Sequence, residues 1–237
     1  MDRVDDIWVY LSASPLLGLV LTLVFFQAAQ WLYLKANKHP LLNPVAVSVL
    51  AIMAVLWVWG ISYETYFEGA QFIHFLLGPA TVALAIPLYQ YRSTLRALWL
   101  PILMSVSLGL MAAGMSAFWI AQFLGASLET MLSLVPKSVT APVAMGIAEK
   151  NGGIPTLTAT FVVITGVLGA ILAPWVFRVM RLKDDQVKGI SMGVSAHGLG
   201  TAKAFQMSPQ MGAFSGLGMA LSAFIAALIL PWIMSVL

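Results

Sequence analysis

The sequence predicts an all-α polytopic membrane protein with about six to eight membrane segments, two of which are broken or re-entrant polar segments in an inverted-repeat arrangement. Three observations lead to this fold class. Hydrophobic residues make up 60% of the chain, charged residues 9%, and the mean hydropathy is +0.92, whereas soluble domains carry roughly 25% charged residues. Uncharged runs of membrane length recur along the chain, and a polar segment precedes each of the last two runs at a spacing of 57 residues.

The uncharged runs each reach the roughly 20 residues that an α-helix needs to cross about 30 Å of hydrocarbon. They cover residues 15–34, 41–61, 72–91, 98–124, 154–177 and 204–237. We therefore treat residues 1–237 as a single membrane domain, with a four-span scaffold region at 1–125 and two repeats that carry the polar breaks at 126–237.

Charged residues between the runs predict the topology, because loops rich in Lys and Arg stay cytoplasmic. Basic residues follow the first and third runs, and acidic residues follow the second (Lys35 and Lys38, Arg92 and Arg96, Glu64 and Glu68). The densest basic loop lies at residues 178–188. It is cytoplasmic only if residues 128–150 enter and leave by the same face; residues 187–206 then re-enter from the opposite face. Eight simple crossings, or broken helices that cross completely, remain alternatives.

The two polar segments are Pro136-Lys137-Ser138-Val139-Thr140-Ala141-Pro142 and Ser195-Ala196-His197-Gly198-Leu199-Gly200-Thr201-Ala202-Lys203. An ungapped register of 57 residues pairs Ser138 with Ser195 and also pairs Pro174 with Pro231. In addition, it pairs Thr140 with His197 and Thr158 with Ser215. A duplicated polar break inside a hydrophobic chain is typical of a transporter whose binding site is built from repeats.

Both segments contain residues suited to binding an anion. Lys137 and Lys203 are candidate counter-charges, since a charge at membrane depth costs at least about 2.5 kcal/mol on insertion scales and is normally kept for a purpose; a lysine that snorkels to the interface is the alternative for each. Hydroxyl groups and free N–H groups at half-helix N-termini would complete a carboxylate site. The candidate hydroxyls are Ser138, Thr140, Ser195 and Thr201, and back-bonding within a helical turn is their alternative role.

His197 stands inside the second break and is a candidate for binding substrate or carrying a co-transported proton, because its pKa lies near physiological pH. A satisfied packing histidine is the alternative. Pro136, Pro142, Gly198 and Gly200 are the expected structural breaks, since proline and glycine interrupt regular helix and permit unwound backbone.

Several function classes find no support in the sequence. A formal charge of +3, scattered along the chain, gives no nucleic-acid footprint, and zero cysteines exclude disulfides and thiolate metal sites. Nucleophile–base pairs, metalloprotease helices, phosphate loops and paired intramembrane carboxylates are missing from the sequence. We expect neither an enzyme nor a bound metal or cofactor.

At these same motifs the chain resembles the LrgB family, also called CidB-like proteins. The matching sequence segments are residues 136–142, Gly-Gly-Ile-Pro at 152–155, and residues 195–204. The resemblance implies a multi-pass protein of the bacterial plasma membrane (the inner membrane in a Gram-negative cell). Members are commonly described as antiholin-like modulators of murein hydrolase activity and cell lysis that act beside a small LrgA-like partner. Plastid relatives are similar to glycolate/glycerate carriers, and bacterial relatives are linked to pyruvate movement.

Two functional expectations follow. The first is a secondary carrier of a small carboxylate anion such as glycolate, glycerate, pyruvate or lactate, with proton coupling through His197. The alternative is an antiholin-like modulator of murein hydrolase export and cell lysis, acting with the LrgA-like protein. Expected partners are the carboxylate, the lipid bilayer and further copies of the chain in a homo-oligomer.

Overall fold

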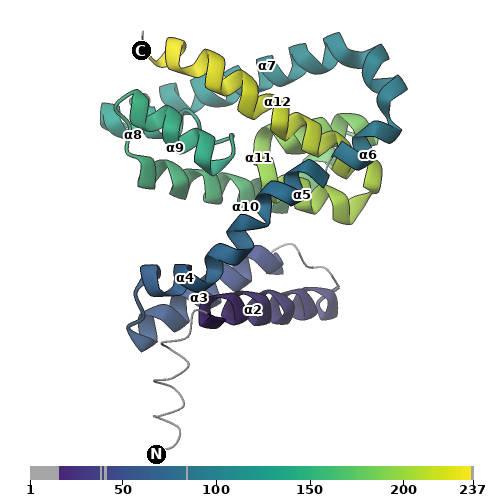
Figure 1. The fold of residues 1–237 in the computed structure, drawn as a ribbon. Helices are drawn as coiled ribbons and strands as arrows, with labels where there is room; N and C mark the ends of the chain where they lie inside the picture. The colour runs from purple at the N-terminus through teal and green to yellow at the C-terminus, as the bar shows by residue number, and fades with distance from the viewer. Residues whose placement is uncertain (1–15, 38, 40–41, 84, 236–237) are drawn as a thin grey trace, which may run out of the picture. The chain divides into compact units, whose positions relative to one another are not determined.

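The computed structural model describes residues 16–37, 39, 42–83 and 85–235, and these are almost entirely helical (Figure 1). The chain forms two compact units, Met1–Ala83 and Leu84–Leu237, so the helices α6 (Ala85–Gln90) and α7 (Arg92–Phe123) cluster with the later helices. The assignment of residues 1–125 to one scaffold therefore stays a prediction. The expected span limits at Pro15, Leu41 and Leu237 lie outside the described residues.

The first unit holds α2 (Leu16–Lys35), α3 (Pro44–Trp59), α4 (Tyr63–Phe75) and α5 (Leu77–Ala83). Asn43 caps α3, since its side chain accepts from the backbone N–H groups of Val45 and Ala46. Helices α2 and α4 pack closely, because a Cβ at Gly18 would lie 2.0 Å from the Tyr66 carbonyl oxygen. The Thr22 and Tyr66 hydroxyls share a hydrogen bond of 2.7 Å between these helices.

The second unit holds the remaining helices. They are α6 (Ala85–Gln90), α7 (Arg92–Phe123), α8 (Leu128–Leu134), α9 (Ala141–Lys150), α10 (Pro155–Val179), α11 (Asp185–Met207) and α12 (Pro209–Met234). Pro101 lies inside α7. Proline removes a helical hydrogen bond and bends the axis, and the α7 ribbon is visibly bent (Figure 1).

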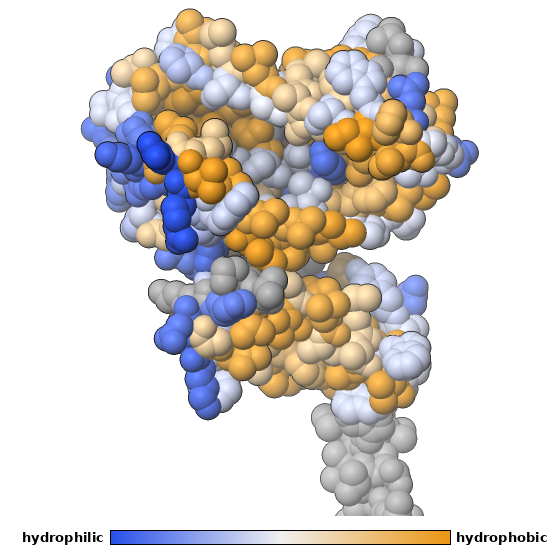
Figure 2. All heavy atoms as spheres, turned by 180° about the vertical axis from the view of Figure 1, so that it is seen from behind, coloured by the Kyte–Doolittle hydropathy of each residue, from blue (hydrophilic) through white to orange (hydrophobic). Residues whose placement is uncertain are grey.

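The helices have the length and apolarity of membrane spans, and the polytopic fold class is confirmed. Candidate spans are Leu16–Lys35, Tyr63–Gln90, Arg92–Phe123, Pro155–Val179 and Pro209–Met234, and α3 is a shorter apolar helix of 16 residues. Large apolar side chains cover the outside: Phe123 is 90% exposed and Trp57 is 85% exposed. Figure 2 shows broad apolar areas on the surface of each unit. Lipid is the solvent that suits such a surface.

Helix α11 is a hairpin of two helical arms. Its turn is at His197, whose φ of 39° and ψ of −128° lie outside the helical region. A straight helix of 23 residues would hold its ends about 33 Å apart. Instead the two ends of α11 meet. Ser208 directly follows the last residue of α11, and its hydroxyl donates at 2.7 Å to Oδ2 of Asp185, the first residue of α11. The second polar segment therefore enters and leaves on one side.

The segment of α8 and α9 makes a similar excursion, in which the chain turns back toward the place where it started. The Ile154 N–H, just beyond α9, donates to the Ser133 hydroxyl of α8 at 2.7 Å, so the chain returns to α8 after the break at residues 135–140. The boundaries follow the 57-residue register: α8 begins at Leu128 and α11 at Asp185, while α9 ends at Lys150 and α11 at Met207. Each excursion is followed by one long helix, and α10 and α12 run in opposite directions (Figure 1). An inverted repeat has this arrangement.

Candidate functional site

The first break places a half-buried lysine against α7 in the second unit. Residues 135–140 connect α8 to α9, and Val135 and Val139 anchor the segment in the core, with exposed fractions of 2% and 1%. Lys137 Nζ donates to the Ala113 carbonyl oxygen of α7 at 2.9 Å. No carboxylate of the described residues lies within ion-pair distance of this ammonium. An ammonium has three donors, so donors remain for a ligand.

Hydrogen-bonding groups beside Lys137 are also left for a ligand. Ser138 is 3% exposed, and its hydroxyl makes no hydrogen bond within the described part of the chain. Thr140 precedes α9 in extended conformation, and its side chain does not cap that helix. The N-terminus of α9, with Pro142 in its first turn, therefore adds backbone donors and a partial positive charge. A cation, two hydroxyls and a helix N-terminus meet at one break.

The second break is fixed by His197, which is 6% exposed. Its Nε2 lies 3.0 Å from the Val162 carbonyl oxygen of α10. Since a carbonyl oxygen only accepts, Nε2 carries the hydrogen, and Nδ1 is left for another partner. The Thr201 hydroxyl donates to the His197 carbonyl oxygen at 2.8 Å and lies 2.9 Å from the Ser215 hydroxyl, which then donates to it. These bonds hold the unwound backbone between α10 and α12.

Two glycines of α10 allow the second break to approach this helix. A Cβ at Gly166 would lie 2.6 Å from His197 Cε1, and a Cβ at Gly169 would lie 2.5 Å from the Ala196 Cβ. Real Cβ atoms do not approach so closely, so both positions require glycine. At Gly200 a Cβ would lie 2.7 Å from the Met192 carbonyl oxygen, on the opposite arm of the hairpin. The absence of a side chain at Gly200 therefore lets the two arms of the hairpin approach each other.

The first break and the helical arm that leads to the second break lie against the same part of α7. Val135 of the first break packs on Gly114, where an added Cβ would be 3.2 Å from the Val135 carbonyl oxygen. Val194, three residues before His197, packs on Gly109, where the distance from an added Cβ to the Val194 Cγ1 would be 3.1 Å. Five helical residues rise about 7.5 Å, so these two contacts lie within a short distance of each other along α7.

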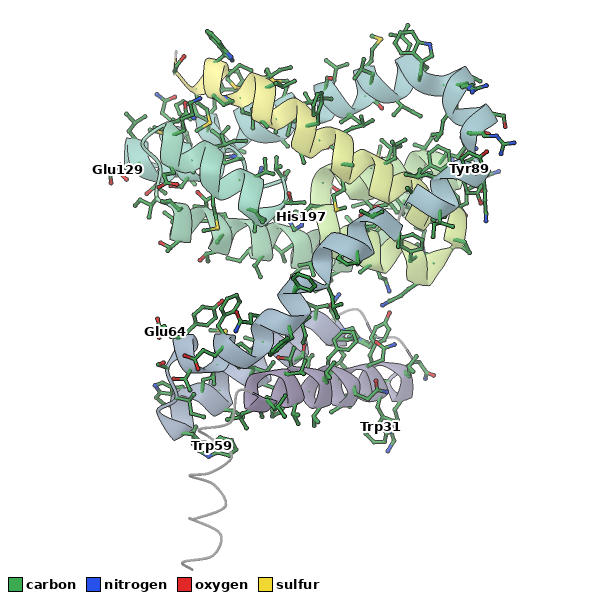
Figure 3. All side chains as sticks on the ribbon, viewed as in Figure 1. Trp31, Trp59, Glu64, Tyr89, Glu129 and His197 are labelled. Atoms are coloured by element: carbon green, nitrogen blue, oxygen red, sulfur yellow. The ribbon has the colours of Figure 1, made fainter. Side chains whose placement is uncertain are left out.

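Helix α10 joins the breaks in the same way. The Thr158 hydroxyl donates to the Ser133 carbonyl oxygen at 3.0 Å, and one turn later the Val162 carbonyl oxygen contacts His197. Figure 3 shows His197 among the helices of the second unit and Glu129 at its edge. The surroundings of Lys137 and His197 are thus brought together by two shared helices.

Three of the predicted residues are placed differently. Ser195 is exposed, and its hydroxyl donates at 2.6 Å to the Ser191 carbonyl oxygen of its own helix, so it has the back-bonded role expected as its alternative. Lys203 is partly exposed and lies on the second arm of α11, beyond the break. Gly198 is exposed, and a Cβ there would have ordinary contact only, 3.9 Å from Met219 Sδ.

Sequence reasoning gave no role to Ser133, Thr158, Ser215 or Gly166. Thr158 and Ser215 were paired by the 57-residue register, and both are completely buried; that pairing was the signal for a matched role. Ser133 and Gly166 lie outside the polar segments, and nothing in their sequence context marks them. The Ala113 and Val162 carbonyl groups are backbone acceptors, which no residue type reveals.

Comparison with known proteins identifies the protein family. The sequence matches the LrgB-like family over residues 22–236. The chain belongs to this family. It is 35% identical to YwbG of Bacillus subtilis over 93% of this chain and 97% of that one. It is also 35% identical to the holin-like protein CidB of Staphylococcus epidermidis over 94% and 96%, and 36% identical to CidB of Staphylococcus aureus over 92% and 95%.

Membership agrees with the resemblance seen in the two polar motifs, which lie within the matched range. No solved structure matches the chain. Together with the candidate spans, the family relation makes this LrgB-like protein a multi-pass protein of the bacterial plasma membrane.

Proposed function

We propose that this LrgB-like protein is a secondary carrier of a small carboxylate, bound between the two helix breaks. The observation that carries the proposal is the Lys137 ammonium, which has a carbonyl oxygen as its hydrogen-bond partner and no counter-ion among the described residues. An unpaired charge in a low-dielectric interior is costly, and a bound carboxylate would neutralise it. We propose no chemical transformation of the anion and no resident cofactor.

The arrangement of the breaks supports alternating access. Unwound backbone at membrane depth is tolerated where it is buried in protein or lines a polar cavity, and half-helix N-termini that converge from two repeats are a recurring carrier site. In this protein Val135 of the first break and Val194, three residues before the turn at His197, contact α7 within five residues of each other. His197 Nδ1 is the proposed position for a co-transported proton.

The second candidate is a holin-like function, and the names of the relatives favour it more directly than they favour the carrier. The similar staphylococcal proteins are holin-like proteins CidB. Under this proposal the chain modulates murein hydrolase export and cell lysis with a small LrgA-like membrane protein, and it forms a homo-oligomer. Such a modulator needs association surfaces, and it has no need of the Lys137 site.

Uptake by proteoliposomes that contain only this protein tests the proposal. Radiolabelled glycolate, glycerate, pyruvate and lactate are supplied outside, and saturable accumulation of at least one of them supports a carrier. Release of a trapped neutral dye would instead indicate a pore. Uptake no greater than in empty liposomes, with the protein shown to be folded, would overturn the carrier proposal and leave the holin-like function.

A further inference from the structure

An open cavity of about 390 Å³ lies at the beginning of α7 and α11. Pro101 and Ser105 of α7 line one side, Gln186, Ile190 and Ser191 of α11 line the other, and Phe214 of α12 completes the wall. Pockets that bind small molecules range from roughly 300 to 1,000 Å³. The cavity has no role in the function proposed above.

The cavity is aligned with the helix breaks. Along α7, Ser105 lies in the cavity, Gly109 contacts Val194 four residues later, and Ala113 accepts from Lys137 four residues beyond that. Four helical residues rise about 6 Å. Along α7, the contact of Gly109 with Val194 thus lies between the cavity and the carbonyl oxygen that Lys137 contacts.

The second wall follows the same order. On the first arm of α11, Ile190 lines the cavity, Val194 follows one turn later, and His197 turns the chain at the break. Both walls therefore lead toward the same place. The contact of Val194 with Gly109 lies between the cavity and the breaks on each of them.

The mouth of the cavity is near the densest group of basic residues. Asp184 lines it, next to the loop that holds Arg178, Arg181 and Lys183, while Lys188 is paired with Asp185 at 3.1 Å. The four basic side chains outnumber the two acidic ones by two. Loops with this excess stay cytoplasmic, which places the cavity at the cytoplasmic end of α7 and α11.

We propose that this cavity is the cytoplasmic entrance of the anion pathway, and that Val194 seated on Gly109 is the seal between the entrance and the Lys137 site. The inference rests on the proposed carrier function for the identity of what enters. Ser105 and Ser191 donate to carbonyl oxygens of their own helices, so the Gln186 side chain is the polar group of these walls that is left to contact the anion ahead of the central site.

Single-cysteine variants test the entrance without background labelling, because the chain has no native cysteine. Ser105→Cys and Ser191→Cys are exposed to a membrane-impermeant methanethiosulfonate reagent in inside-out vesicles, with Leu108→Cys as the control. Leu108 is exposed, like Ser105 and Ser191, and lies at nearly the same depth of α7 as Ser105, but it does not line the cavity. Since the thiolate, which forms in water, attacks the reagent, cavity positions should react roughly ten-fold faster or more. Rates equal to that of Leu108→Cys, as a lipid-filled groove would give, would overturn the proposal.

The seal has its own test. Lys137→Cys should react slowly from the cytoplasmic side when Val194 is present, and faster in the double variant with Val194→Ala. Unchanged reaction in the double variant would remove Val194 as the seal. An acid that the wild type takes up, chosen among glycolate, pyruvate and lactate, should slow labelling of Ser191→Cys, and a lack of protection would contradict an entrance. Labelling does not require transport, so its failure is distinguishable from failed uptake.

Discussion

The Ser208 hydroxyl donates to Asp185 Oδ2 at 2.7 Å, and this bond joins the two ends of the α11 hairpin. Ser208 also accepts from the Met211 N–H and so caps α12. One side chain therefore closes the base of the hairpin and begins the helix that follows it.

Ser208→Ala should destabilise the protein by about 1–2 kcal/mol, because it removes an N-cap and a hydrogen bond to a carboxylate. Thermal unfolding in detergent, followed by circular dichroism, measures the change. Ser235→Ala is the control, since the Ser235 hydroxyl is exposed and bonds only to the Trp232 carbonyl oxygen. An equal loss from both variants would show that the Ser208 bond has no special role.

Stability should depend on the ionisation of Asp185, which stands at the base of the hairpin outside the candidate spans. The Ser208 hydrogen bond is the main cause that lowers the pKa of Asp185, helped by Lys188 and opposed by desolvation. A lowered folded pKa stabilises the protein above the ordinary aspartate pKa, and this contribution is lost as the pH falls through the folded value. The stability of Asp185→Asn should lack this contribution when unfolding is followed as the pH is lowered. A pH profile equal to that of the wild type would contradict the prediction.

Lys137→Ala should reduce carboxylate uptake by about 10- to 100-fold, because hydrogen bonds to charged groups contribute roughly 1.5–3 kcal/mol. Initial rates in proteoliposomes measure the effect. Lys150→Ala, which removes an exposed lysine at the end of α9, should change uptake little. Similar mild losses from both variants would exclude Lys137 from the binding site.

Gly166→Ala should destabilise the second break by about 1–3 kcal/mol, the usual cost of overpacking, because its Cβ would collide with the His197 ring. Uptake should fall together with thermal stability. Gly146→Ala provides a matched control on α9, where no atom lies within 4 Å of the added Cβ, and alanine favours helix by up to about 1 kcal/mol. A stable, fully active Gly166→Ala protein would show that the His197 position is adaptable.

Cysteines at Lys150 and Lys183 should label from opposite faces of the membrane. The prediction follows from two excursions that each return to their own side, with α10 crossing between them. Both positions are exposed, so an impermeant reagent reaches each of them in vesicles of known orientation. Labelling of both from one face would make the inverted topology wrong.

The observed helix boundaries follow the 57-residue register, because a repeat keeps the length of its segments. Thr140 and His197 do stand at equivalent turns, and the matched ends at Lys150 and Met207 agree. The helical breaks were predictable because proline, glycine and clustered hydroxyl groups interrupt apolar helices.

The detailed contacts were less predictable. Ser195 was expected in the site but faces outward, since a hydroxyl in a helix can bond to its own turn. Lys137 bonds to a backbone oxygen of α7, a partner that depends on how distant helices pack. Gly166 has a role only because His197 approaches it. Residue types identify the breaks, whereas tertiary packing decides which side chains meet there.

The hairpin form of α11 has a consequence for biogenesis. Its polar sequence is not among the candidate spans, whereas α12, which follows it, is one, and the hairpin packs against α12 through Ser215 and the close contacts of Gly193. A polar segment in lipid needs protein around it. We therefore expect the hairpin to enter the bilayer only after α12 has been synthesised and integrated, so that truncation before residue 209 leaves the second half of the site in water.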